Sequence, residues 1–361
     1  MISLTGTFGR YVFKRFITSI LGVFAVVFLL IFTIDAVEVF RTSLGGNQAS
    51  LLTILMLSFM RTPAVAEQVI PFATLFGALI AFLNLSRRLE LVVIRGAGVG
   101  VWQFILPAIA AAGAIGLATI LVFNPISARL KSTAEDMSFT TFKPGRSNEQ
   151  EVWLRQRTDQ GSAVIRGYRG SNKEPRFTNM TIFSFDNAGR FIERFQADKA
   201  ELVGNEWNLS AVRILSPGTE PQSRSELKIP TNLTAAQVRQ SLTPPETISF
   251  YDLPDWAARL KAAGLDANRY LQQYRSLLAR PFLLMAMILV AASSSLRFSR
   301  SGANGRAILT GIASGFGLYI VNKITGDLGS VGTFSTSFAA FFPPVLAGLL
   351  GILVLLYQED G

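Results

Sequence analysis

Long apolar runs alternate with short polar segments along most of this 361-residue chain. Six of these runs approach or exceed the roughly 20 residues that an α-helix needs to cross the hydrocarbon core of a bilayer. The pattern therefore predicts six transmembrane helices, at residues 12–34, 64–83, 101–123, 277–296, 307–324 and 338–357.

A long polar insert at residues 125–275 separates the third run from the fourth. It contains short β-type runs separated by turn-forming residues, with period-two alternation at residues 181–185. We expect strands at residues 151–156, 163–168, 180–185, 190–197, 199–203, 206–215 and 225–229. The predicted fold class is an α-helical membrane protein with six transmembrane helices and an inserted all-β, jelly-roll-like domain. We expect this domain to be a small β-sandwich or jelly roll.

The sequence predicts two helices at the end of the insert. Pro254 and Asp255 would open a short helix over residues 256–263 that Gly264 ends, and Asp266 would cap a second helix that continues into the fourth span. The predicted division is residues 1–124 for the first three spans, 125–275 for the β-domain with its connecting helix, and 276–361 for the last three spans.

Residues 86–98, between the second and third spans, are too short to cross a membrane and predict an amphipathic helix. Ser86 suits the N-cap, Glu90 would lie in the first turn, and Gly96 would stop the helix. Three apolar residues would share one face: Leu89, Val92 and Val93. We interpret the segment as a docking helix that carries one acid among three arginines, Arg87, Arg88 and Arg95.

The charge content supports a membrane protein. Only 16% of the residues are charged, and the mean hydropathy is +0.37. The net charge of +10 does not indicate nucleic-acid binding, because the basic residues neither gather on one helix nor alternate with aromatic residues.

Basic residues in the short loops predict the orientation. They precede the first span and follow the second and fourth, whereas the opposite side has few: Arg41, Arg61 and Lys323. The positive-inside rule therefore places both termini and residues 86–98 in the cytoplasm and the β-domain on the far side. The first apolar run is too long for a signal peptide and lacks a following cleavage site, so we expect a retained helix.

Several kinds of catalytic chemistry are absent from the sequence. Without Cys or His the chain has no disulfides, thiol nucleophiles, Cys/His zinc sites or histidine acid–base catalysis, although a carboxylate metal site or a Ser/Lys nucleophile stays open. It also lacks a P-loop motif, and Gly96-x-Gly98-x-Gly100 lacks the strand and the spacing of a dinucleotide fingerprint. Any transport would therefore need energy from a partner, for which residues 86–98 are the natural docking point.

Polar residues in the spans leave alternatives open. Asp35, Glu38 and Lys323 either reach the membrane interface or contact a polar ligand group or a partner helix. Glu67, one turn before Pro71, either pairs with a loop arginine or faces a ligand. The small-residue patterns at 77–81 and 311–315 indicate helix packing within the bundle or a moving interface, and the serines at 293–295 are expected to bond back to helix carbonyls.

Two stretches resemble a known family. Residues 76–98, with the run Arg-Leu-Glu-Leu-Val-Val-Ile-Arg, and residues 311–317, Gly-Ile-Ala-Ser-Gly-Phe-Gly, are similar to the LptF/LptG permeases of the lipopolysaccharide-export ABC transporter, and more to the LptG branch. Residues 253–270 resemble the junction before the fourth span in that family. The order of elements also matches, so the resemblance covers essentially the whole chain.

The resemblance implies a non-catalytic permease subunit in the inner membrane of a Gram-negative bacterium, with the β-domain in the periplasm. Its expected partners are an LptF-like permease, a dimer of the ATPase LptB, LptC and a periplasmic LptA-like bridge, with lipopolysaccharide as substrate. The chain itself would hold no cofactor, because ATP and Mg²⁺ would bind to the ATPase. Residues 86–98 would be the coupling helix, with Glu90 facing an arginine of the ATPase. The first and fifth spans would contribute to lateral gates.

One departure concerns the lipid site. Some members of the family carry lysines at the outer end of the first span, where this chain reads Asp-Ala-Val-Glu-Val-Phe-Arg over residues 35–41. The candidate residues for a lipid gate or cavity are Asp35, Glu38, Arg41, Glu67, Arg129, Lys131, Tyr319 and Lys323.

Two other functions remain as alternatives. The chain could be a permease that transmits motion for another envelope lipid or a lipoprotein, although such chains usually show four spans. A membrane enzyme with carboxylates in the β-domain is the other, but its acids lie at ordinary solvated strand positions: Glu193, Asp198, Glu201 and Glu206.

Overall fold

The computed structural model describes residues 6–44, 50–96, 98–142, 150–158, 161–169, 176–186, 188–218, 220–231, 234–299 and 304–359. The chain forms two compact units. The first comprises Met1–Met137, Glu246–Tyr251 and Leu271–Gly361, and the second comprises Ser138–Pro245 and Asp252–Tyr270. We call them the helical unit and the sheet unit.

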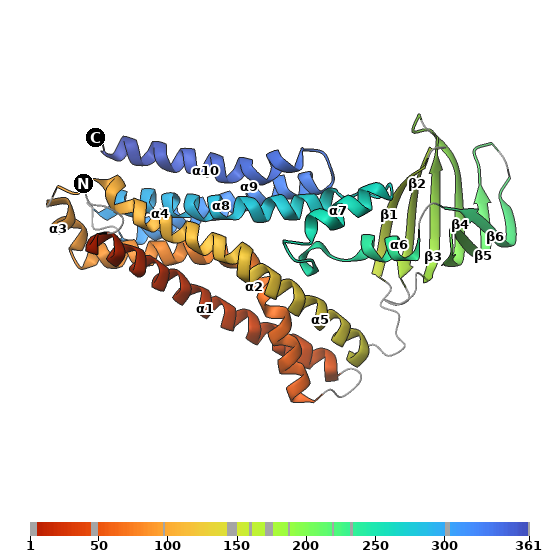
Figure 1. The fold of residues 1–361 in the computed structure, drawn as a ribbon, viewed down its shortest axis with the longest axis horizontal. Coiled ribbons are helices and arrows are strands. Elements are labelled where there is room, and N and C mark those ends of the chain that lie inside the picture. The colour runs from red at the N-terminus through yellow and green to blue at the C-terminus, as the bar shows by residue number, and fades with distance from the viewer. Residues whose placement is uncertain are drawn as a thin grey trace. The chain divides into compact units, whose positions relative to one another are not determined.

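The helical unit contains the predicted spans. Across the described residues, six helices are long and apolar enough to cross a membrane, which confirms the six-span prediction. In chain order they are α1 (Thr7–Leu44), α2 (Leu51–Arg87), α4 (Val101–Ala118) with its continuation, α8 (Asn268–Ser299), α9 (Asn304–Ser330) and α10 (Thr336–Glu359) (Figure 1).

The third span continues well past its predicted end. A π-helical turn at Thr119–Phe123 joins α4 to α5 (Asn124–Phe142), so helical structure extends 19 residues beyond the apolar run. The prediction ended at residue 123 because hydropathy reports only the apolar part of a helix and not the extent of its backbone hydrogen bonding.

Close helix crossings hold the helical unit together. A Cβ added at Gly77 of α2 would lie 2.6 Å from the Cα of Ile20 on α1, and the Phe16 and Phe82 rings pack edge to face at 4.8 Å. Gly315 of α9 lies against Leu75 of α2. These small residues therefore pack helices of the same chain against each other, as one of the two predicted roles requires.

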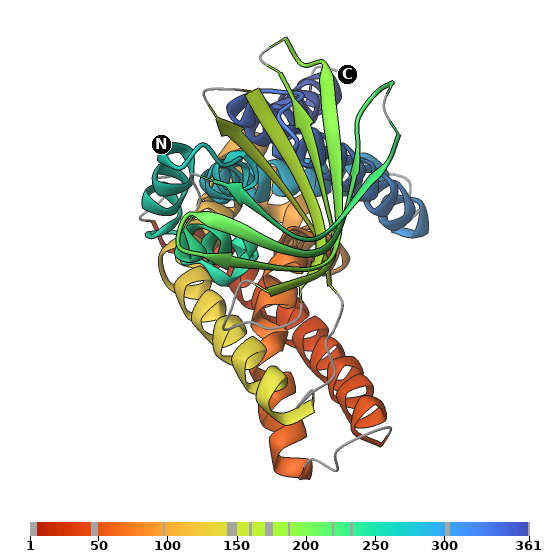
Figure 2. The ribbon, with the colours of Figure 1, turned by 90° about the vertical axis from the view of Figure 1, so that its right-hand side faces the viewer.

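In its described residues, the sheet unit holds six antiparallel strands in the order β1-β2-β3-β4-β5-β6. Their bounds are β1 Gln150–Thr158, β2 Gly161–Arg169, β3 Arg176–Phe185, β4 Phe191–Val203, β5 Glu206–Leu215 and β6 Gln222–Pro230. Figure 2 shows the sheet as strongly curved. The inserted all-β domain is thus confirmed, and its described strands pair as one continuous meander rather than as two facing sheets.

Two predicted strands are in fact one. Residues 190–197 and 199–203 were predicted separately, but both lie in β4. Asp198 and Lys199 are exposed in succession, which interrupts the alternation of buried and exposed side chains, while the pairing with β3 and β5 continues on both sides. The backbone ladder therefore persists where the side-chain pattern breaks.

Short helices complete the sheet unit. Helix α7 (Leu253–Ala262) is followed by Gly264, whose φ is +72°, and Asp266 accepts a hydrogen bond from the Asn268 amide at 2.9 Å. Both predicted stop and cap residues are therefore confirmed. Helix α6 (Ala235–Leu242) was missed, although Thr234 and Gln237 form a capping box at its start.

Candidate functional site

The predicted docking helix forms, but over a shorter range. Helix α3 comprises Glu90–Gly96, and α2 extends through Ser86 to Arg87. Ser86 as the N-cap was therefore wrong: its carbonyl accepts from the Leu89 amide at 3.0 Å at the end of α2. The fully buried Leu85 keeps the packed face of α2 going to this point, and tertiary burial overrides the local capping signal.

A sharp corner separates α2 from α3. Leu89 has a φ of +59°, a left-handed conformation that costs a non-glycine residue about 1–2 kcal/mol. At the other end, Gly96 lies inside the helix, and Gly98 takes the positive φ of +78° that the sequence led us to expect at Gly96. The Val99 amide then bonds to the Ile94 carbonyl at 3.3 Å and closes the end of the helix.

Helix α3 buries Leu91 against the rest of the helical unit. Leu91 is buried in the main apolar cluster of the helical unit, whereas Leu89 and Val93 are 63% and 70% exposed. Of the three residues predicted to share an apolar face, Leu89 and Val93 are thus both exposed, but Leu89 lies before α3 rather than in it. The side chains of Val92 and Arg95 lie outside the described part of the structure.

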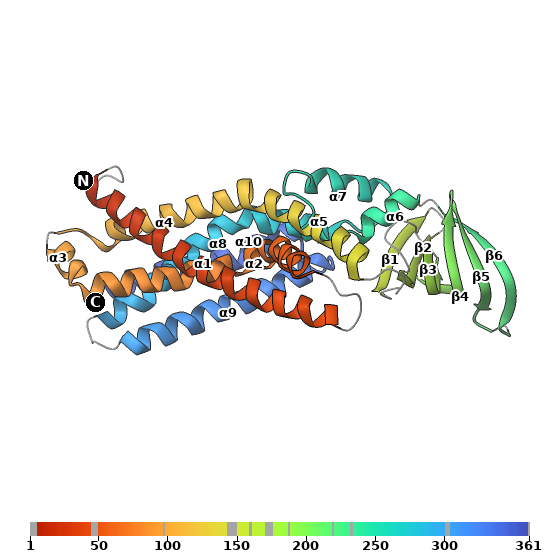
Figure 3. The ribbon, with the colours of Figure 1, turned by 90° about the horizontal axis from the view of Figure 1, so that it is seen from below.

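Glu90 is the first residue of α3 and is half-buried. The Tyr11 hydroxyl of α1 donates a hydrogen bond to its Oε2 at 2.9 Å. Arg87 and Arg88 are exposed next to it in sequence. Figures 1 and 3 show α3 at the same end of the helical unit as the start of α1 and the end of α10. The predicted docking residues Arg87, Arg88 and Glu90 thus lie together at one end of the bundle.

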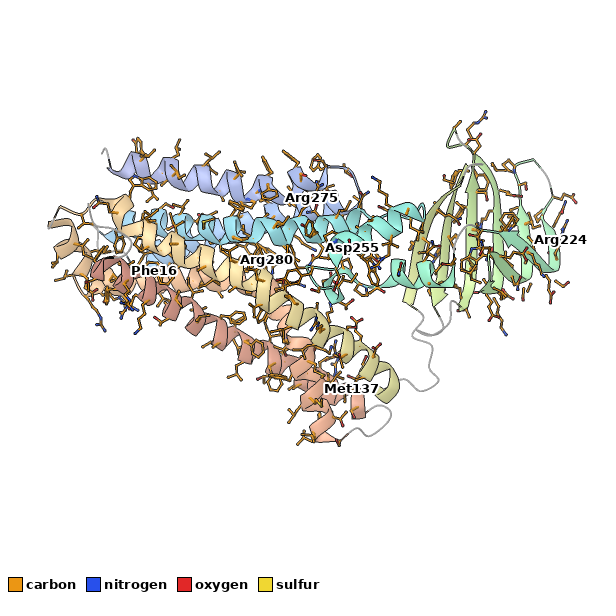
Figure 4. All side chains as sticks on the ribbon, viewed as in Figure 1. Phe16, Met137, Arg224, Asp255, Arg275 and Arg280 are labelled. Carbon is orange, nitrogen blue, oxygen red and sulfur yellow. The ribbon has the colours of Figure 1, made fainter. Side chains whose placement is uncertain are left out.

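A second polar site lies inside the helical unit. Arg280 of α8 places Nη1 2.5 Å from Oε1 of Glu67 on α2, and the two side chains are 14% and 8% exposed (Figure 4 labels Arg280). The side-chain Nδ2 of Asn124 donates to both carboxylate oxygens of Glu67, at 3.1 and 3.2 Å. Glu67 therefore pairs with a helix arginine and not with the loop arginine that we considered from the sequence.

The same network reaches the segment 246–251. Asn124 Oδ1 accepts from the Phe250 amide at 2.9 Å, and the Tyr251 hydroxyl donates to the Leu121 carbonyl at 3.1 Å. Leu121 lies in the π-helical turn that joins α4 to α5. The Phe250 and Tyr274 rings stack at 5.1 Å. One network of polar and ring contacts thus joins α2, α5, α8 and this segment, buried at Glu67 and exposed at Tyr251.

Sequence reasoning missed Arg280 and Asn124. Arg280 lies in the predicted fourth span, where a charged residue calls for a partner, and Glu67 lies in the second. Two opposite charges in separate apolar spans were a usable signal. Asn124 gave none, because it stands at the polar end of the third apolar run.

The other predicted lipid-site residues form separate contacts. Oδ1 of Asp35 lies 3.8 Å from Nη1 of Arg61. Oε1 of Glu38 lies 3.0 Å from Nη2 of Arg41 on the same helix. Two lysines form ion pairs: Nζ of Lys131 lies 3.4 Å from Oε2 of Glu246, and Nζ of Lys323 lies 3.1 Å from Oδ1 of Asp327. The ring centroids of Tyr319 and Phe72 are 4.9 Å apart. Arg129 is exposed on α5. The structure therefore does not gather these residues, or Glu67, into one site.

Comparison with known proteins decides the family. A family model described as "Lipopolysaccharide export system permease LptF/LptG" matches residues 10–357, nearly the whole chain. The chain belongs to this LptF/LptG permease family. Two relatives named "Lipopolysaccharide export system permease protein LptG" are similar to it over almost their full lengths. The protein from Haemophilus influenzae is 26% identical over 95% of this chain and 96% of its own, and that from Escherichia coli K12 is 24% identical over 96% and 94%.

Membership confirms the resemblance of residues 76–98 and 311–317 to LptF/LptG permeases. It makes the chain a permease subunit without catalytic activity of its own, and with six candidate spans it is a multi-pass protein of the inner membrane.

Proposed function

We propose that this chain is an LptG-type permease subunit that extracts lipopolysaccharide from the inner membrane and passes it towards a periplasmic bridge. The observation that carries the proposal is α3, a short helix exposed between two spans. It carries Glu90 next to Arg87 and Arg88 at one end of the helical unit. The family match over residues 10–357 and the two LptG relatives support it.

Orientation follows from the distribution of charge. Arginines and lysines flank α1, α2 and α8 at the α3 end, so the positive-inside rule puts α3 and both termini in the cytoplasm. The sheet unit is then periplasmic, where it contributes a β-domain to the bridge formed with LptC and an LptA-like protein.

Energy comes from a separate ATPase in this proposal. A dimer of LptB binds ATP and Mg²⁺ and docks on α3 of this chain and on the corresponding helix of an LptF-like partner. Glu90 pairs with a cation of the ATPase, and Arg87, Arg88 and Arg95 line the same docking surface. A carboxylate and exposed guanidinium groups within one short segment suit charge-assisted contacts to a partner of mixed charge.

The lipid path needs an apolar surface and cations for phosphate. Each methylene moved from bilayer to water costs about 0.8 kcal/mol, so a lipid with several long acyl chains must stay in apolar surroundings. Exposed apolar side chains on α1 and α9, such as Leu29 and Phe316, supply such surfaces. We propose that the lipid gate or cavity is bordered at separate points by Asp35, Glu38, Arg41, Glu67, Arg129, Lys131, Tyr319 and Lys323, with Arg129 as the exposed cation on α5.

The test is substitution of Glu90 in the assembled transporter. We expect Glu90→Ala and Glu90→Lys to lower recovery of the ATPase with the tagged permease by at least about tenfold, since each removes one side of a charged contact. Lipopolysaccharide export should fall in parallel.

Glu38→Ala is the matched control for ATPase recovery alone, because Glu38 is an exposed acid of α1 that pairs within its own helix. Unchanged ATPase recovery and unchanged export in both Glu90 variants would contradict the docking role. Mass spectrometry of the complex purified from native membranes tests the partners and the bound lipid directly.

A further inference from the structure

The main apolar anchor of helix α1 lies near its start, with Val39 and Ser43 buried again near its end. Its buried apolar residues near the start are Val12, Phe16 and Ile20, at 0%, 0% and 1% exposure. Among residues 21–38, all of which the structure describes, none is buried, and Val39 is the next buried apolar residue. A displacement at the first turns of α1 would therefore be carried along an otherwise lightly packed helix.

The docking helix contacts α1 at this anchored end. Leu91 of α3 lies in the apolar cluster that also contains Val12 and Phe16. One polar contact accompanies it: the Tyr11 hydroxyl donates to Glu90 Oε2 at 2.9 Å. Tyr11 precedes Val12 in α1, as Glu90 precedes Leu91 in α3, so polar and apolar contacts lie side by side.

Two residues with positive φ separate α3 from the helices before and after it. The left-handed Leu89 separates it from α2, and Gly98, also with positive φ, separates it from α4. Neither corner continues a helical hydrogen-bond ladder from one helix into the next. The direction in which Glu90 presents its carboxylate therefore depends on side-chain contacts, and among the described residues the Tyr11 hydroxyl is the group that hydrogen-bonds to an oxygen of that carboxylate.

We propose that Tyr11 is a positioning residue for ATPase coupling. It holds Oε2 of Glu90, so that Oε1 is directed towards a cation of the ATPase, and it passes displacement of α3 to α1. A carboxylate accommodates both contacts because each oxygen carries its own lone pairs. The inference rests on the proposed docking role of Glu90. It adds that the hydroxyl of Tyr11 is needed to convert docking into movement of α1.

The experiment uses the complete transporter, purified through a tag on the ATPase and reconstituted with lipopolysaccharide. The variants are Tyr11→Phe, Glu90→Gln and the double variant. Tyr11→Phe keeps the ring and removes the hydrogen bond. The matched control is Tyr357→Phe, in a tyrosine that is 84% exposed near the end of α10. The readouts are ATPase recovery, ATP hydrolysis and lipid molecules exported per ATP hydrolysed.

We expect Tyr11→Phe to assemble normally but to export about fivefold to tenfold fewer lipid molecules per ATP, the scale of one typical hydrogen bond at an exposed site. In the Glu90→Gln background the same change should have little further effect, because Tyr11 acts through Glu90. A purely structural tyrosine would lower the amount of complex and leave this ratio unchanged.

Three results would overturn the inference. They are a Tyr11→Phe ratio equal to that of Tyr357→Phe, effects of Tyr11→Phe and Glu90→Gln that multiply independently, and loss of the assembled complex in Tyr11→Phe. Failure of the proposed docking role is distinguishable, because Glu90→Ala would then retain the ATPase. If Glu90→Ala releases the ATPase while Tyr11→Phe is silent, only the role of Tyr11 fails.

Discussion

Arg280 and Glu67 form a buried ion pair between two predicted spans, with Nη1 and Oε1 2.5 Å apart. They are 213 residues apart in the sequence. Asn124 donates to the same carboxylate and accepts from the Phe250 amide, so the pair belongs to a network in which both charges have polar partners. In Figure 1 the ends of α1, α2 and α5 farthest from α3 diverge from α8, α9 and α10. This pair ties α2 to α8 across the two groups.

Breaking the pair on one side should destabilise the helical unit strongly. Glu67→Gln and Arg280→Met each leave a buried group without its charged partner, and we expect a loss of about 3–5 kcal/mol in the free energy of unfolding. Thermal unfolding of the detergent-purified protein measures this. The double variant Glu67→Gln/Arg280→Met should recover much of the loss, since it leaves no uncompensated charge.

The control for this prediction is Lys323→Met. Lys323 also pairs with an acid, Asp327, but both side chains are 63% exposed, so the change should be within about 1 kcal/mol. Equal effects of Lys323→Met and Arg280→Met would show that burial of the Glu67 pair has no energetic consequence.

Gly77 should be intolerant of any side chain. A Cβ there would lie 2.6 Å from the Cα of Ile20, a backbone atom that cannot rotate away. We expect Gly77→Ala to separate α1 from α2 and to destabilise the unit by about 1–3 kcal/mol, as overpacking does. Melting temperature and disulfide cross-linking between cysteines introduced on α1 and α2 would report the change.

Gly22→Ala is the matched control for Gly77. A Cβ at Gly22 meets nothing within 4 Å, and in a helix the substitution should stabilise by about 0.5–1 kcal/mol. A Gly77→Ala protein as stable as Gly22→Ala would argue against the close crossing of α1 and α2.

The turn between β3 and β4 should loosen at low pH. Hydrogen bonds from the Arg190 backbone amide hold the pKa of the Asp186 carboxyl below its usual value, with help from the Arg190 guanidinium and the Ala188 amide. A carboxyl with a lowered folded-state pKa stabilises fully above its unfolded pKa. That contribution is lost as the pH falls through the lowered folded-state value.

Hydrogen exchange tests this turn. After correction for the intrinsic pH dependence of exchange, the amides of Ala188 and Arg190 should lose protection as Asp186 is protonated. Asp186→Ala should remove that protection at neutral pH and abolish its pH dependence. Protection that is insensitive to both pH and Asp186→Ala would exclude the role assigned to this carboxylate.

The six spans, the inserted β-domain and the family could be predicted from the sequence. Apolar run length and period-two alternation are local properties that each segment carries by itself. Local chemistry also located the Gly264 stop and the Asp266 cap correctly. It failed at Ser86, where a good capping residue lies inside α2 because Leu85 beside it is buried.

The partners of the charged residues were decided only by tertiary structure. The sequence shows that Glu67 and Arg280 each stand in an apolar run and that Tyr11 and Glu90 flank spans, but it gives no angle at which helices cross. Helix packing brings the first two within 2.5 Å and the second two within 2.9 Å. The sequence by itself determined which segments are long and apolar enough to cross a membrane and that a short segment with Glu90 stands between two of them. Packing decided which polar side chains meet, because that depends on helix faces that face each other only after the chain has folded.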